Sequence, residues 1–119
     1  MGPAEEGHSY GLRWKIERQS GLVTVRLQGE LDLASGDALF GAVDGLAAEG
    51  ALLVFDLAEL EFMDSTGLRL LARVKQNSDE SGHRFLLGRV SAPVLRVLHV
   101  SGLLAHFDYV EGQPPDEAL

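Results

Sequence analysis

The sequence predicts an α/β fold built on a mixed β-sheet, and three observations lead to this fold class. Two segments near the N-terminus, residues 14–17 and 23–28, alternate apolar and polar side chains as half-buried strands do. The run at residues 52–55 is apolar throughout, which indicates a strand buried on both faces. Beyond it, apolar residues fall at helical spacing, so strands and helices alternate. Because residues 24, 26 and 28 give one side of a strand a polar face, we expect helices packed mainly on one face of the sheet.

The elements before the central strand are expected as follows. Gly21 allows a turn between the first two strands, and the polar side formed by residues 24, 26 and 28 should face solvent. A helix is expected around residues 39–46, with Ser35 or Asp37 as its N-cap and a stop at Gly50.

The elements after the central strand follow the same alternation. The strand is expected to end at Asp56, and a short acidic link at residues 58–61 should lead to a helix from about Thr66 to Asn77. A strand at residues 85–87 follows. A last helix should begin near Pro93, because proline is tolerated in the first turn, and should end at Gly102.

The domain is expected to span residues 12–110, between an N-terminal tail at 1–11 and an acidic C-terminal tail at 111–119. No apolar run approaches the roughly 20 residues of a membrane span, and residues 1–11 lack the basic and apolar regions of a secretion signal. We therefore expect a cytoplasmic protein with no membrane insertion.

The charge of the chain is negative and uneven. The net charge is −8, and residues 30–64 contain nine acidic residues and no Lys or Arg. Nucleic acids bind to basic surfaces, so this distribution argues against a nucleic-acid partner. It favours a protein partner with a basic surface, although solvated turns would give the same pattern.

The sequence contains no recognisable catalytic or metal-binding motif. It has no cysteine, and its four histidines, His8, His83, His99 and His106, are scattered without metal-ligand spacing. An aspartic protease needs a second acidic motif that this chain lacks. We therefore expect no enzyme activity, cofactor or metal.

The most informative segment is Asp64-Ser65-Thr66-Gly67, which stands where a strand gives way to a helix. Asp64 or Ser65 is a suitable N-cap, and unpaired N–H groups at such a terminus favour a phosphate. If Asp64 is the cap, the Ser65 hydroxyl points outward, within reach of a kinase. Gly67 is unfavourable inside a helix, and we interpret it as space for the backbone of a partner.

Together with Gly29-Glu30-Leu31-Asp32 and Ser101-Gly102-Leu103, this segment resembles the STAS-domain anti-sigma factor antagonists, the bacterial anti-anti-sigma factors. The resemblance covers roughly residues 20–110 in the same order, and Thr66 departs from it mildly by replacing a second serine. It implies a single STAS domain in which Ser65 is phosphorylated. The expected partner contacts are Asp32, Asp64, Ser65, Thr66, Gly67, Leu68 and Arg69.

The resemblance also implies a mechanism of partner switching. The unphosphorylated chain would bind an anti-sigma factor that is also a serine kinase, and this would release the sigma factor. The partner would bind ATP and phosphorylate Ser65, and a phosphatase would reverse the modification. Two alternatives remain open, a scaffold subunit of a stress-signalling assembly and a component of a lipid-transport complex, neither of which needs phosphorylation of Ser65.

Overall fold

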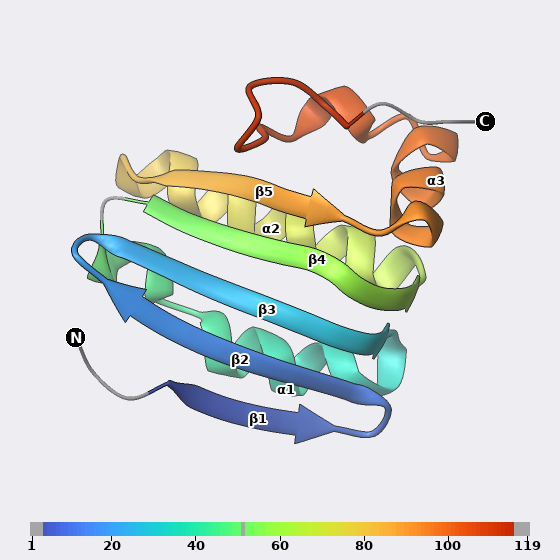
Figure 1. Cartoon of the computed structure of the whole chain (residues 1–119), viewed down its shortest axis with the longest axis horizontal. Helices are drawn as coiled ribbons and strands as arrows, with labels where there is room; N and C mark the ends of the chain where they lie inside the picture. Colours follow the sequence, from blue (N-terminus) through green and yellow to red (C-terminus); the bar gives the residue numbers. More distant parts are fainter. Residues whose placement is uncertain (1–3, 51, 116–119) are drawn as a thin grey trace.

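A five-stranded mixed sheet forms the centre of the molecule, with the strands in the order β1-β2-β3-β4-β5 (Figure 1). The computed structural model describes residues 4–50 and 52–115. β1 pairs antiparallel with β2 and β2 with β3, whereas β3, β4 and β5 run parallel. The strands are β1 (Glu5–Ser9), β2 (Leu12–Gln19), β3 (Leu22–Leu31), β4 (Leu52–Met63) and β5 (Arg84–Val90).

Two long helices cover one face of this sheet and leave the other face open (Figure 1). The helical segments are α1 (Leu33–Val43), the 3-10 helix η1 (Leu46–Glu49), α2 (Ser65–Ser81), α3 (Ala92–Val100) and the 3-10 helix η2 (Leu104–His106). α1 and α2 lie behind the sheet in the view of Figure 1, and α3 follows β5 and packs against β4. The expected α/β fold, a mixed sheet with helices mainly on one face, is confirmed.

The core lies between the sheet and α1 and α2. On β3, the side chains of Val23, Val25 and Leu27 are buried, whereas those of Arg26 and Gln28 are exposed on the open face. This alternation follows from the two-residue period of a strand, as the sequence predicted.

The central strand β4 is longer and less buried than expected. It runs on to Met63, so the predicted acidic link at residues 58–61 is wrong, and Asp56 lies inside the strand. Burial on both faces is also wrong, because Leu53 and Phe55 are buried but Val54 is only partly covered on the open face. Irregular pairing between β4 and its neighbours, opposite Arg26 and after Phe55, lets this long strand follow the twist of the sheet.

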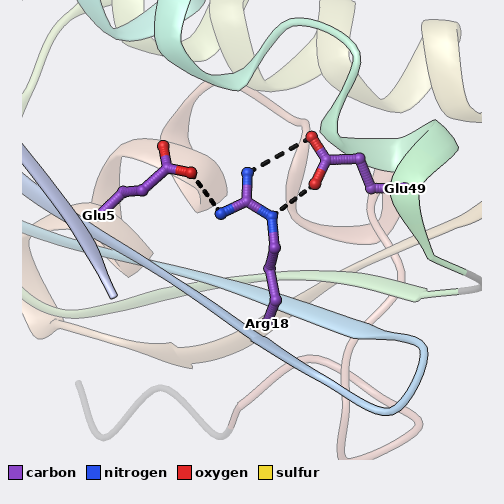
Figure 2. A network of polar contacts seen from close by, with 3 residues as sticks. All are labelled: Glu5, Arg18 and Glu49. Atoms are coloured by element: carbon purple, nitrogen blue, oxygen red, sulfur yellow. Dashed lines mark hydrogen bonds and ion pairs between the residues drawn. The ribbon is translucent and has the colours of Figure 1, made fainter. Parts of the chain in front are cut away.

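β1 lies within residues 1–11, for which the sequence predicts a tail. Residues 5–9 instead pair with β2 as the edge strand of the sheet, and that part of the prediction is wrong. Arg18 of β2 joins this strand to η1, because its guanidinium contacts Glu5 at 2.5 Å and Glu49 at 2.5 Å (Figure 2). The edge strand is therefore connected to the rest of the domain by side chains as well as by backbone hydrogen bonds.

The opposite edge of the sheet is covered by the C-terminal segment. Tyr109 forms a parallel bridge with Leu87 of β5, and its hydroxyl donates a hydrogen bond of 2.6 Å to the carbonyl oxygen of Leu104. Burial raises the pKa of Tyr109 to about 12. Within the predicted acidic tail, residues 111–115 contain no helix or strand, and residues 116–119 lie outside the described residues.

Candidate functional site

α1 and α2 begin side by side at the edge of the sheet that is formed by the C-terminal ends of β3 and β4, rather than at either of its outer strands. β3 and β4 are parallel neighbours whose last paired residues are Leu31 and Met63, and an aspartate follows each of them. The backbone N–H of Asp64 donates to the carbonyl oxygen of Leu31 at 3.3 Å, which fixes the two chain segments together. Asp32 and Asp64, far apart in the sequence, therefore stand next to each other.

Asp64 caps α2 and places Ser65 at the first position of the helix. One oxygen of the Asp64 carboxylate accepts hydrogen bonds from the backbone N–H groups of Thr66, at 2.8 Å, and Gly67, at 3.2 Å. Ser65 is exposed, as expected for a residue just after the cap.

The same cap changes the expectation that the start of α2 holds a phosphate. The N–H groups of Thr66 and Gly67 already bind the Asp64 carboxylate, and the N–H of Asp64 itself donates to the Leu31 carbonyl oxygen at 3.3 Å. Most of the donors that make a helix terminus attractive to phosphate are thus occupied. That expectation is wrong in this form: a phosphate on Ser65 would extend toward solvent.

Asp32 plays the same part at the start of α1. Its carboxylate accepts from the N–H groups of Ala34, at 3.1 Å, and Ser35, at 3.2 Å. The Asp32 N–H in turn donates to the Ser35 hydroxyl at 3.1 Å, which completes a capping box. The predicted caps, Ser35 and Asp37, are therefore wrong: Ser35 is the buried third residue of the helix, and Asp37 is an exposed residue inside it.

Gly67 is explained by packing inside the domain. It is buried, and a Cβ atom at this position would lie 2.3 Å from Cγ of Met63 and 3.1 Å from Cγ of Leu31. No side chain fits in that space without moving its neighbours. The expectation that Gly67 leaves room for a partner's backbone is wrong, and the residue instead lets α2 approach the ends of β3 and β4.

The predicted site residues divide into two groups. Asp32, Asp64, Ser65 and Thr66 come together at the sheet edge, where the methyl group of Thr66 faces Gly36 of α1. Farther along α2, Arg69 is exposed, and the partly buried Leu68 packs against the core.

Exposed apolar side chains next to this edge were missed by sequence reasoning. Leu33, the first residue of α1, is 77% exposed, and Phe62 near the end of β4 is 47% exposed. Phe62 pairs with Glu30, and both point away from the helices because their neighbours Leu31 and Met63 are buried. A single apolar residue carries no sequence signal of exposure, since that depends on where the helix begins and where the strand ends.

The charge at this edge is acidic. Glu30, Asp32, Glu61 and Asp64 lie within four residues of the two strand ends, and in the part of the chain that the structure describes no ion pair neutralises them. By contrast, Asp56, on the open face, pairs with Arg89 at 2.7 Å. The edge around Ser65 therefore presents hydroxyl groups and apolar side chains within a negative field.

Two other kinds of feature are absent from residues 4–50 and 52–115. These residues contain no group of three or more His, Asp or Glu side chains placed to hold a metal ion. Nor does any helix among them have the length and apolar character needed to cross a membrane.

The sequence of this chain matches the model of one protein family. The model of the STAS domain matches residues 13–113, and the chain belongs to the STAS domain family. Curated relatives include the anti-sigma F factor antagonist of Paenibacillus polymyxa, 32% identical over 94 residues that cover 77% of this chain and 80% of the relative. The anti-sigma-F factor antagonist RsfB of Mycobacterium tuberculosis is 32% identical over 89 residues, covering 74% of this chain and 72% of the relative.

Solved structures give the same result. The crystal structure of an anti-sigma factor antagonist from Mycobacterium paratuberculosis superposes with a TM-score of 0.73 at 28% identity, covering 83% of this chain and 86% of that chain. SpoIIAA, an anti-sigma factor antagonist described in its unphosphorylated form, superposes with a TM-score of 0.65 at 26% identity, covering 76% of this chain and 81% of that chain. The anion transporter Slc26a9 of the mouse, at 17% identity and a TM-score of 0.64, shares the fold over 15% of its length.

Proposed function

We propose that this chain is a cytoplasmic anti-sigma factor antagonist, a regulatory binding protein rather than an enzyme. It binds an anti-sigma factor and thereby releases the sigma factor. The observation that carries the proposal is the exposed Ser65 at the start of α2, beside the acidic end of β3, in a chain whose relatives are named anti-sigma factor antagonists.

The switch is phosphorylation of Ser65 by the anti-sigma factor, which acts as a serine kinase and binds the ATP. Two features support Ser65 as the acceptor rather than Thr66. Ser65 is exposed, whereas Thr66 is partly buried and its methyl group faces Gly36 of α1. A separate phosphatase reverses the modification. A phosphate that extends toward solvent from the exposed Ser65 would be accessible to such an enzyme.

Charge explains how the modification would release the partner. A phosphoserine carries about −1.5 to −2 charges at neutral pH. Inside the interface this charge would lose water, and the carboxylates of Asp32 and Asp64 at the same edge would repel it, because they carry charge of the same sign. An uncompensated interfacial charge costs on the order of 2–5 kcal/mol, or roughly 30-fold to several-thousand-fold in affinity.

The first prediction tests this switch. The wild-type chain is used to capture partners from its host, the anti-sigma factor among them is identified by mass spectrometry, and its binding to purified variants is measured by titration calorimetry. Ser65→Ala should bind and should resist inactivation by ATP, whereas Ser65→Glu should bind at least about 30-fold more weakly. Asp32→Asn should weaken binding while it retains an oxygen that caps α1.

Ser81→Glu is the matched control, because Ser81 is an exposed serine at the other end of α2. It adds the same charge away from the edge and should bind like the parent. If Ser65→Glu and Ser81→Glu bind equally well, the phospho-switch is wrong. A scaffold role in a stress-signalling assembly, or a role in a lipid-transport complex, would then take its place.

A further inference from the structure

The turn between β1 and β2 lies at the same end of the sheet as Ser65 but precedes the segment that matches the STAS domain model. That match begins at residue 13, and the turn consists of Tyr10 and Gly11. Figure 1 shows the turn beside the end of β3 and the start of α1. The turn therefore lies beside the edge described above but outside the segment that matches the family model.

This turn is held in a fixed position against the end of β3. The N–H of Glu30 donates to the carbonyl oxygen of Gly11 at 3.1 Å. Gly29 has a φ of 99°, and a Cβ atom there would lie 2.0 Å from the same oxygen, so only glycine lets the turn approach so closely. The backbone of the turn is thus fixed beside the end of β3, which leads directly into Asp32 and α1.

Tyr10 is the first residue of a two-residue turn, a position that requires positive φ and favours glycine, and the packing of the core does not account for a tyrosine there. Its side chain is 82% exposed, and its φ of 54° lies in the left-handed region that favours glycine. An exposed tyrosine contributes little to the core, and its backbone is strained, so glycine at this position would suit the fold better. Strain at an exposed aromatic side chain is a reason to seek its role in binding.

The distances place Tyr10 within reach of a partner that covers Ser65. Neighbouring strands lie about 4.8 Å apart, so the turn at the start of β2 is about 10 Å from the end of β4. A protein interface of ordinary size covers about 800 Å² on each partner, which corresponds to a radius of about 16 Å. Phe62 and Leu33, both exposed, belong to the strand end and the helix start in the same region.

We propose that Tyr10 is a recognition residue for the anti-sigma factor, contacting an apolar or cationic site beside the one that receives Ser65. The inference rests on the proposed function and deepens it. Tyrosine suits this part, because its ring provides large contact area with few rotatable bonds and packs well against arginine. The acidic edge favours a partner with a basic surface, so both kinds of contact are available.

The test, our second prediction, uses Tyr10→Gly, in which fold and binding should respond in opposite directions. Glycine relieves the strained backbone, so the melting temperature should rise by several degrees. Loss of the ring should weaken binding of the purified anti-sigma factor roughly tenfold in calorimetry. Tyr10→Phe should keep most of the affinity because it keeps the ring.

Ser20→Gly is the matched control. Ser20 is the other described non-glycine residue with positive φ, at 44°, and it lies in the turn between β2 and β3 at the opposite end of the sheet. This variant should also melt higher but should bind like the parent. Unchanged binding by Tyr10→Gly, with Ser65→Glu still defective, would overturn the inference alone, as would a lower melting temperature of Tyr10→Gly. A parent chain that binds no anti-sigma factor would overturn the proposed function together with the inference.

Discussion

Ser65 and Gly67 lie two positions apart in α2 and have opposite surroundings. Ser65 is exposed at the first position of the helix, whereas Gly67 is buried against Met63 and Leu31. A kinase or partner can reach the first residue, and only the interior of the domain contacts the second. At this scale one short motif therefore serves two purposes, presentation of a hydroxyl group and close packing of a helix on a sheet.

Gly67→Ala, our third prediction, tests the packing role. The added methyl group would overlap the Met63 side chain, so we expect destabilisation by about 1–3 kcal/mol, as for other overpacked sites. Gly41→Ala is the control, because Gly41 is an exposed residue of α1 with nothing within 4 Å of the added methyl group. It should stabilise the domain by about 0.5–1 kcal/mol. Urea denaturation measures both, and equal effects of the two substitutions would contradict the packing explanation.

Residue types at the site were predictable, but some of their roles were not. The order Asp64-Ser65 indicated a capped helix with an outward hydroxyl, and the structure confirms the cap and the exposure of Ser65. The role of Gly67 could not be predicted, because it depends on the position of Met63 across a strand end. Likewise, both Asp32 and Ser35 are residue types that cap helices. Asp32 is the cap because β3 ends at Leu31 and the helix begins directly after Asp32.

Among the elements, β1 shows where sequence patterns fail. Residues 5–9 have no apolar alternation, so nothing in them indicates a strand. The segment becomes a strand because β2 offers an unpaired edge and because Arg18 binds Glu5 from the neighbouring strand. The hydrogen bond from Arg18 also lowers the pKa of Glu49 below its ordinary value of 4.5, and Arg18 itself has a raised pKa.

The fourth prediction concerns this connection. Arg18→Gln should lower the protection of β1 backbone amides in hydrogen exchange but should change the melting temperature little, because ion pairs at the surface contribute little to stability. Lys75→Gln breaks another exposed ion pair, with Asp79 inside α2, and should leave β1 unchanged. If both variants exchange like the parent, the contacts of Arg18 do not hold the strand.

The same connection should depend on pH. The Glu49 pKa is lowered in the folded state, so its contribution is fully present above pH 4.5 and is lost as the pH falls through the lowered value. Below pH 4.5 the parent should therefore lose the contact between Arg18 and η1, and the protection factors of the η1 backbone amides should decrease toward those of Arg18→Gln.

For the molecule as a whole, the alternation of strands and helices was sufficient to predict the fold class, and the parallel pairing of β3, β4 and β5 agrees with it. Most helix and strand positions were also predicted. The extent of β4 was not, because its second half exposes Ala58, Glu59 and Glu61 in part or in full, and such residues are typical of a loop. Long-range pairing with β3 keeps this half extended.

The fifth prediction concerns the phosphorylated form. The phosphate would extend from an exposed position whose nearby backbone donors already bind Asp64, so no internal contact needs to change. The favourable interaction with the helix dipole, about 0.3–1 kcal/mol, is offset in part by the Asp64 charge. The melting curves of the two forms should nearly coincide. A fall of several degrees would show that modification acts by unfolding the domain rather than by changing its surface.

The open face of the sheet has a consequence for how this protein evolves. Helices cover one face only, and on the other face the exposed side chains of Arg26 and Arg89 both pair with Asp56 instead of supporting the core. Substitutions on the covered face change the packing of the interior and are removed by selection. On the open face, inherited changes of charge can accumulate at little cost to stability. Descendants of this chain are therefore expected to vary most on that face while they keep the same interior.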